Sequence, residues 1–487
     1  MNSNCAVFGC TITNRNTTMD TKTLRQKILD LAIHGKLVPQ DPNDEPASVL
    51  LERIKVEKER LIKEGKIKRS KKSAKTSDTP HYENVPFEVP ESWVWCRLED
   101  IAYIASGSTP DKTCFVKEGI PYIKMYNLRN QEIDFDYQPQ YITEEIHNSK
   151  LQRSRTEVGD LIMNIVGPPL GKLAVIPATL PQANFNQAAV LIRPYKYKED
   201  LVLYLKSYLE EMSEINSIAT RGSAGQVNIS LTQSQNMRIP LPPLAEQQRI
   251  IAEISKWFAL INQIEQGKID LQTIIKQTKS KILDLAIHGK LVPQDPNDEP
   301  AIELLKRINP DFTPCDNGHY AQLPNGWTTI KVGDVAIYTN GRAFKPEDWM
   351  RQGLPIIRIQ NLNDKSASYN RTSQTYESRY LIHNGDLLFA WAASLGTYVW
   401  NGGKAWLNQH IFKVEPYPFI EKQYLYHVFK AMITEFYTQS HGSGMVHITK
   451  KQFENIKLLL PPLEEQKRIV QTLEQISTKL DEIMESL

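Results

Sequence analysis

The chain has 487 residues, which is too long for one ordinary domain and favours about three folding units. Its formal net charge of +2 excludes a protein that binds polyanions through bulk charge, so any contact with nucleic acid must use local positive patches. No apolar run reaches the ~18 residues that a membrane-spanning helix needs, and the first residues lack the basic start of a signal peptide.

The five cysteines are scattered, with no CxxC pair and no histidines at zinc spacing. An odd number at irregular positions favours free thiols in a reducing cytoplasm. No histidine is interpreted as a ligand, and no metal site is predicted. The cysteines are Cys5, Cys10, Cys96, Cys114 and Cys315.

The N-terminal region has two parts of different character. Residues 1–18 are polar and rich in Asn and Thr, which predicts a disordered tail or a start assigned too early, because a helical pattern begins after Met19. Residues 19–80 predict an N-terminal helical segment and a basic linker. The linker contains KIKRSKKSAK at 66–75, for which a solvated linker is favoured over an arm that binds DNA.

An identical internal repeat organises the chain. The 21-residue sequence KILDLAIHGKLVPQDPNDEPA occurs at 27–47 and again at 281–301, which does not happen by chance. PPLAEQQRI at 242–250 returns as PPLEEQKRI at 461–469. The centre of the chain carries both motifs, whereas each end carries only one. The plan is therefore cyclic, and it predicts a chain that closes on itself with approximate two-fold symmetry.

The spacer segments predict long helices that pair as an antiparallel coiled coil. Apolar residues in 244–301 recur at alternating steps of four and three, the period of a supercoiled seam. A helix over 244–288 would rise about 65 Å, unless Gly267 breaks it. Gly35 and Gly289 are predicted to end the helices of the two repeat copies. The seam residues are Ile250, Ile254, Trp257, Ile261, Ile264, Leu271, Ile275, Ile282 and Leu285.

Segments 81–243 and 302–462 predict two similar, loop-rich domains of α/β (α+β) type. Short runs such as LAVI and AAVLI, bounded by Gly, Pro and Asn, predict strands. Residues 202–215 and 423–437 predict an amphipathic helix near the end of each domain. Weaker echoes, such as VGDLIM with NGDLLF and FNQA with LNQH, indicate that the two domains share one frame.

This layout resembles the specificity subunit of type I restriction-modification systems over nearly the whole chain after Met19. The resemblance rests on the two PPL-EQ motifs, the identical repeat, the loops GSAGQVNIS and GSGMVHIT, and domain openings of the type W-x₄-LEDIA. It implies two target-recognition domains, at 81–243 and 302–462, separated by conserved helical segments at 244–301 and 463–487.

The resemblance also implies a function and partners. Each target-recognition domain would recognise one half of a split, asymmetric site in double-stranded DNA. The conserved helices would dock two methyltransferase subunits, and restriction subunits would join that core. S-adenosylmethionine, with ATP and Mg²⁺ for restriction, would be used by those partners, so no cofactor is expected in this chain. The expected location is the cytoplasm, with no membrane contact.

The residues themselves indicate no catalytic centre. Gly35-Lys36-Leu37 lacks the rest of a GxxxxGK[ST] phosphate loop. GPPL at 167–170 is not the Asn/Asp-Pro-Pro-aromatic element with which an amino-methyltransferase holds a flipped base. We therefore predict a non-catalytic recognition subunit. The alternatives are a two-domain coiled-coil scaffold that binds protein or carbohydrate and, less favoured, a methyltransferase fused to its recognition unit.

The internal repeat separates frame residues from candidates for DNA contact. Two domains that recognise different half-sites should share frame residues and differ in the residues that contact bases. Shared residues are interpreted as structural, and the Asn-Gln pairs are too, although Asn and Gln can bond adenine. These shared residues are Trp93 and Trp327, Asp100 and Asp334, Gly107 and Gly341, and the pairs Asn186-Gln187 and Asn408-Gln409.

Two further shared features leave two interpretations open. Lys124 and Arg358 have the same position and charge, which suits a phosphate contact, although a solvated surface cation fits as well. The glycine-rich loops could place backbone N–H groups on phosphate, but a plain tight turn is slightly favoured. The loop glycines concerned are Gly222, Gly225, Gly442 and Gly444.

The variable stretches hold the better candidates for base contact, because Arg is the side chain that most often recognises guanine and also clamps phosphate. In the first domain they are Lys112, Arg129, Asn130, Gln131, Arg153 and Arg155. In the second domain they are Arg342, Lys345, Arg351, Asn363, Lys365, Arg371 and Arg379.

Overall fold

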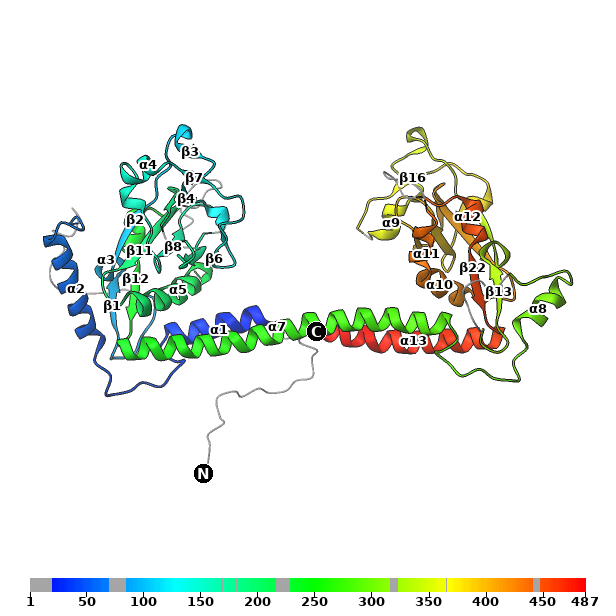
Figure 1. Ribbon diagram of the computed structural model, residues 1–487, viewed down its shortest axis with the longest axis horizontal. Helices are drawn as coiled ribbons and strands as arrows, with labels where there is room; N and C mark the ends of the chain where they lie inside the picture. Colours follow the sequence, from blue (N-terminus) through cyan, green and yellow to red (C-terminus); the bar gives the residue numbers. More distant parts are fainter. Residues whose placement is uncertain are drawn as a thin grey trace, which may run out of the picture. The chain divides into compact units, whose positions relative to one another are not determined.

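The structure, a computed structural model, describes residues 20–69, 85–167, 170–180, 182–215, 228–315, 323–364, 366–440 and 447–487. It divides into two compact units, residues 19–266 and residues 267–487. Each unit contains one mixed domain of strands and helices and one pair of long helices (Figure 1). The predicted disordered tail at 1–18 lies outside the described residues.

The first unit runs from an N-terminal helix to the first part of α7. Its elements in chain order are α1 (Thr21–Ile33), α2 (Ala47–Lys63), β1 (Val94–Arg97), α3 (Leu98–Ile101), β2 (Ala102–Ser106), η2 (Lys112–Cys114), β3 (Phe115–Val116), β4 (Ile120–Ile123), η3 (Met125–Asn127), β5 (Leu128–Arg129), β6 (Glu132–Ile133), β7 (Tyr141–Ile142), α4 (Glu144–Asn148), η4 (Gln152–Ser154), β8 (Leu161–Asn164), β9 (Leu173–Val175), β10 (Asn184–Phe185), β11 (Ala189–Pro194), α5 (Lys198–Ile215), α6 (Leu231–Gln235), β12 (Arg238–Leu241) and α7 (Leu244–Ile287). Helix α7 continues through Gly267, so the break considered there does not occur.

The second unit repeats this order after the end of α7. Its elements are α8 (Ala301–Ile308), β13 (Thr328–Lys331), η5 (Val332–Asp334), β14 (Ala336–Asn340), η6 (Pro346–Asp348), β15 (Leu354–Ile357), α9 (Ile359–Asn363), β16 (Asn370–Thr372), η7 (Ser378–Tyr380), β17 (Leu381–Ile382), β18 (Leu387–Ala390), β19 (Gly396–Val399), β20 (Ala405–Leu407), β21 (Ile411–Pro416), α10 (Lys422–Ala431), α11 (Ile433–Thr438), α12 (Lys450–Asn455), β22 (Lys457–Leu460) and α13 (Leu463–Ser486). The single helix predicted over 423–437 is two helices, because the chain turns at Met432 and brings Phe436 into the aromatic core beside Phe389.

Each domain is built on a four-stranded antiparallel sheet, ordered β2-β11-β8-β9 in the first and β14-β21-β18-β19 in the second. Successive side chains of a strand point to opposite faces. Leu161 and Met163 of β8 therefore join a core with α1, α2 and α5, whereas Ile162 faces a second core with Ile123 of a smaller sheet. Both faces of β8 are buried, which explains why residues 161–163 form a continuous apolar run.

The long helices pair in antiparallel fashion within each unit, as predicted. Near its start, α7 contacts the loop after α1, where Glu246 accepts a hydrogen bond from Gln40. Further along, Glu265 of α7 pairs with Arg25 of α1 at 3.1 Å. In the second unit, Lys268 donates to the backbone oxygen of Leu487 at the end of α13.

The predicted seam is only partly buried. Ile250, Ile254, Ile261 and Ile275 are buried in their units, as a coiled-coil seam requires. Ile264 and Leu271, by contrast, are each 37% exposed, because the partner helices α1 and α13 cover different parts of α7.

Three repeated motifs meet at one junction in each unit. Gly35 has φ +64° and ends α1, and a Cβ there would lie 2.5 Å from Cγ of Pro90. Trp93, from the same PESW motif, donates its indole N–H to Glu246 in the first turn of α7 at 2.9 Å. In the second unit, the indole N–H of Trp327 donates to Glu465 at 3.0 Å. The equivalent residues of this unit are Gly289, Pro324, Trp327 and Glu465.

Within the described ranges, no helix is both long enough and apolar enough to cross a membrane. Of the five cysteines, Cys96, Cys114 and Cys315 are free, and Cys5 and Cys10 lie outside those ranges.

Candidate nucleic-acid interface

A tight turn follows strand β2 in the first domain and strand β14 in the second. A Cβ at Gly107 would lie 2.0 Å from the backbone oxygen of Asn186, and a Cβ at Gly341 would lie 2.2 Å from that of Asn408. Such separations exclude any side chain, so only glycine fits at either position. This close approach agrees with the structural role predicted for the two glycines.

The residue after each glycine has the same backbone environment but a different side chain. The N–H of Ser108 donates to the backbone oxygen of Phe185 at 3.1 Å, and the N–H of Arg342 donates to that of Leu407 at 2.8 Å. Ser108 and Arg342 are therefore equivalent positions. We call the side chains around them the first turn cluster (Ser108, Thr109, Tyr122, Arg153 and Gln187) and the second turn cluster (Arg342, Phe344, Asp348, Tyr376 and Trp406).

The first turn cluster is polar. Arg153 reaches from η4 and donates to Oγ of Ser108 at 2.9 Å. The hydroxyl of Tyr122 donates to the backbone oxygen of Ser108 at 3.0 Å, and Thr109 donates to the side-chain oxygen of Gln187. Burial raises the pKa of Tyr122. The cluster therefore presents a cation and an amide beside the turn.

The second turn cluster is aromatic and cationic. The guanidinium of Arg342 lies 4.3 Å from the ring centre of Tyr376 and 5.7 Å from that of Phe344. Tyr376 meets Trp406 edge-on at 5.3 Å. The hydroxyl of Tyr376 lies 2.8 Å from the side-chain oxygen of Gln374 and 3.2 Å from the carboxylate of Asp348, whereas Arg342 is 4.0 Å from that carboxylate. Among the described residues, Nε of Arg342 and Nε1 of Trp406 have no hydrogen-bond partner.

Arg153 and Arg379 occupy corresponding turns, η4 and η7, at the same distance before the shared Gly-Asp pair. In the second domain the guanidinium of Arg379 has local contacts. It pairs with Glu377 at 3.0 Å and lies 4.8 Å from the ring centre of Tyr380. The two domains therefore bring a guanidinium to the turn from different positions of one frame.

Lys124 and Arg358 begin corresponding turns in the two domains. Their backbone N–H groups donate to the side-chain oxygens of the buried residues Asn127 (2.9 Å) and Asn361 (3.1 Å). These asparagines are frame residues that sequence analysis did not single out, although the repeated letters NL marked them. Burial, followed by the charge of Arg358, lowers the pKa of the neighbouring His410.

Other first-domain candidates lie in a turn or contact residues of the same domain. Asn130 and Gln131 form the turn between β5 and β6 with φ of 51° and 59°, and Gln131 accepts a hydrogen bond from the N–H of Leu173 at 2.7 Å. Arg129 lies 4.1 Å from the ring centre of Tyr137.

Arg155 also bonds within the first domain. It donates to the backbone oxygen of His147 at 3.1 Å and to the side chain of Asn148 at 2.5 Å. Lys112, in η2, is exposed and available to a ligand.

Some of the remaining second-domain candidates are exposed, whereas others bond within their domain. Lys345 and Arg351 are exposed. Arg371 donates to a backbone oxygen in the loop before β15 at 3.0 Å, and Asn363 accepts a hydrogen bond from the hydroxyl of Tyr398 at 2.5 Å. Five candidates lie outside the described residues, as does most of the basic run at 66–75: Gly222, Gly225, Lys365, Gly442 and Gly444.

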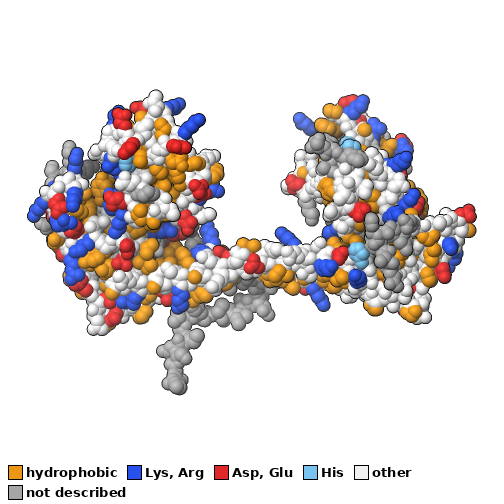
Figure 2. All heavy atoms as spheres, in the orientation of Figure 1, with side chains coloured by type: hydrophobic (Ala, Val, Ile, Leu, Met, Phe, Trp, Pro, Cys, Tyr) orange, Lys and Arg blue, Asp and Glu red, His pale blue; other side chains and the backbone are white. Residues whose placement is uncertain are grey.

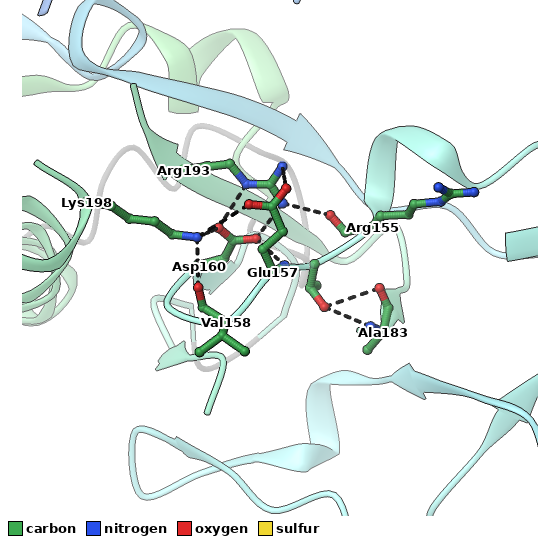
Figure 3. A network of polar contacts seen from close by, with 8 residues as sticks. Arg155, Glu157, Val158, Asp160, Ala183, Arg193 and Lys198 are labelled. Atoms are coloured by element: carbon green, nitrogen blue, oxygen red, sulfur yellow. Dashed lines mark hydrogen bonds and ion pairs between the residues drawn. The ribbon is translucent and has the colours of Figure 1, made fainter. Parts of the chain in front are cut away.

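A buried carboxylate fixes the segment that carries Arg155 (Figure 3). Asp160 is fully buried and pairs with Arg193 at 2.6 Å and with Lys198 at 2.7 Å. Arg193 also donates to the backbone oxygen of Arg155 at 3.0 Å. The network therefore ties η4 to β11 and α5. Only the shared Gly-Asp motif indicated it in the sequence.

On the face drawn in Figure 2, Lys and Arg side chains are interspersed with Asp and Glu side chains over both units. No group of three or more His, Cys, Asp or Glu side chains in the described part of the chain is arranged to hold a metal ion. The described candidates therefore offer local cations and aromatic rings rather than a uniformly basic surface.

Two copies of one frame, with different side chains at an equivalent turn and a pair of long helices in each unit, define a two-domain recognition subunit. The sequence matches the profile of the family described as type I restriction modification DNA specificity domain, over residues 90–272 and 324–487. The chain therefore belongs to this family. It is a specificity subunit, the recognition part of a type I restriction enzyme and not its catalytic part.

Relatives and solved structures agree with this assignment. The chain is 29% identical to the type I restriction enzyme EcoAI specificity subunit of Escherichia coli, covering 93% of this chain and 88% of that protein. It is 28% identical to the EcoEI specificity subunit of Escherichia coli, covering 96% and 90%. The HsdS subunit from Thermoanaerobacter tengcongensis has a similar fold, with a TM-score of 0.51, 20% identity and coverage of 82% and 93%.

Proposed function

We propose that each domain recognises one half of a bipartite, asymmetric site in double-stranded DNA. The observation that carries this proposal is the equivalence of Ser108 and Arg342: one backbone frame holds different side chains at the same position. Two half-sites of different sequence require this combination, because the frame must dock alike while the base contacts differ.

The proposal assigns the chain to an assembly. The domains at 81–243 and 302–462 recognise DNA, and the helical segments at 19–80, 244–301 and 463–487 dock two methyltransferase subunits, which restriction subunits join. S-adenosylmethionine, ATP and Mg²⁺ belong to those partners. The location proposed is the cytoplasm.

The exposure of each side chain separates stronger from weaker candidates for DNA contact. Lys112, Arg153, Lys345 and Arg351 are exposed, and the side chain of Arg342 is 39% exposed. Lys124 and Arg358 remain proposed phosphate contacts, because a contact to phosphate suits both halves equally. Gln131, Arg155 and Asn363 are weaker candidates, because they already bond within their domains.

The test is to co-express the chain with its neighbouring methyltransferase subunit in a host without DNA methylation and to map modified bases across the genome. A single split motif, with a modified adenine in each half, is the expected result. A stable complex that modifies nothing would contradict the proposal and favour a scaffold that binds something other than DNA.

A further inference from the structure

We propose that Arg342 recognises a guanine in the half-site of the second domain, and that Arg153, bound to Ser108, provides the corresponding guanidinium in the first domain. This inference rests on the proposed function and adds to it the base contacted and the two residues that differ.

The first argument is positional. Phosphate contacts are the same for any sequence, so they belong at frame positions with the same charge in both domains. Arg342 occupies a frame position where the first domain has Ser108. A position that keeps its backbone and changes its side chain is expected of a residue that selects a base.

The second argument is preorganisation. The rings of Tyr376 and Phe344 lie beside the guanidinium of Arg342, at 4.3 Å and 5.7 Å between charge and ring centre. Such contacts hold the planar group in one orientation, which lowers the entropy lost when it forms a bidentate bond. Two parallel N–H donors match O6 and N7 of guanine in the major groove.

The third argument is availability. The carboxylate of Asp348 lies 4.0 Å from Arg342 and already accepts a hydrogen bond from the N–H of Lys345 at 2.8 Å. Arg342 is therefore only weakly neutralised. Arg193, by comparison, is engaged by two carboxylates and a backbone oxygen.

In the first domain, a residue of η4 brings a guanidinium to the equivalent turn. Arg153 is exposed and uses one nitrogen on Oγ of Ser108 at 2.9 Å, which directs the guanidinium while leaving other donors free. Its counterpart Arg379 pairs with Glu377 instead. Arg153→Ala is therefore expected to affect only the first half-site, as Arg342→Ala affects only the second.

The decisive measurement uses the wild-type complex of this chain with its methyltransferase subunits, so that it does not depend on the folding of a variant. Once methylation mapping has given the motif, each guanine of the second half-site is replaced, one at a time, by 7-deazaguanine, which lacks the N7 acceptor. Binding is expected to weaken at one position. The same replacement should cause no further loss in Arg342→Ala.

Arg342→Ala and Arg342→Lys should both relax the motif at that one base pair, by on the order of 10- to 100-fold in preference for guanine. Arg358→Ala is the matched comparison, because Lys124 has the same charge at the equivalent position of the first domain, and it should weaken binding to all sequences equally. If Arg342→Ala instead lowers affinity uniformly and reduces the slope of log K against log salt by about one, it contacts phosphate and the inference is wrong.

The failure of this inference can be distinguished from the failure of the proposed function. A wild-type complex that modifies no DNA contradicts both. A wild-type complex with a clear split motif contradicts the inference alone if the second half contains no guanine, or if its motif is unchanged in Arg342→Ala.

Discussion

The indole N–H of Trp93 donates a 2.9 Å hydrogen bond to the carboxylate of Glu246, and both side chains are buried. Gln40 donates to the other carboxylate oxygen. The bond joins the opening of the first domain to the first turn of α7. Trp327 and Glu465 form the same bond in the second unit. Because two of the repeated motifs supply this pair, we infer that it fixes each domain to its helix.

The first prediction concerns the pH dependence of this junction. Burial, the largest cause, raises the pKa of Glu246 above its ordinary value of 4.5. The folded state therefore holds this proton more tightly than the unfolded state. The resulting stabilisation is complete below pH 4.5 and is lost as the pH rises through the folded-state pKa.

Glu246→Gln removes this titration and places an amide donor beside Gln40. We expect the variant to be less stable than the wild type by about 1 kcal/mol at low pH, with the difference shrinking as the pH rises. Urea unfolding of the full chain, repeated from below pH 4.5 upward, measures this difference in stability. Glu465→Gln is the matched variant, since burial raises the pKa of Glu465 as well. A difference that grows with pH would contradict the assignment.

The second prediction compares two equivalent carboxylates. The carboxylate of Asp160 is fully buried and pairs with Arg193 and Lys198, so Asp160→Asn should destabilise the first unit by about 3–5 kcal/mol. The side chain of Asp386 is 24% exposed and lies 3.8 Å from Lys413. Asp386→Asn should therefore cost about 1 kcal/mol or less. Denaturant unfolding of both variants tests the ranking, and equal losses would refute it.

The third prediction concerns the turn glycines. Gly107→Ala places a methyl group 2.0 Å from a backbone oxygen of Asn186, which a side-chain rotation cannot relieve. We expect a loss of about 1–3 kcal/mol in the first unit and weaker recognition of the first half-site alone. Gly341→Ala should do the same to the second. As a control, alanine at Gly267, where a Cβ meets no atom within 4 Å, should leave stability unchanged or slightly raise it.

The fourth prediction is that the length of α7 sets the gap between the half-sites. Seven residues inserted after Gln266 lengthen the helix by about 10 Å, which corresponds to about three base pairs. Methylation mapping should then give the same two half-sites with a longer gap. Gln263→Glu changes an exposed side chain and keeps the helix length, so it should keep the gap. Altered half-site sequences would show that the helix does not act as a ruler.

Sequence alone determined the architecture of this protein, because repeats and periodicity are local. The identical 21-residue repeat and the PPL-EQ motifs predicted the helical segments, and the seam period predicted that these helices pair in a coiled coil. The glycines Gly35 and Gly289 were predicted to end helices, which their positive φ confirms. The resemblance carried by these motifs predicted the family.

The candidate site depended on tertiary structure. No pattern brings Arg153 to Ser108, 45 residues apart in sequence, or Tyr376 and Trp406 to Arg342. The exposed stretch of α7 at Ile264 and Leu271 likewise follows from where the terminal helices end. Helix-forming contacts lie three or four residues apart and can be recognised in a sequence, whereas side-chain clusters on loops depend on how distant strands pair, which only the folded chain decides.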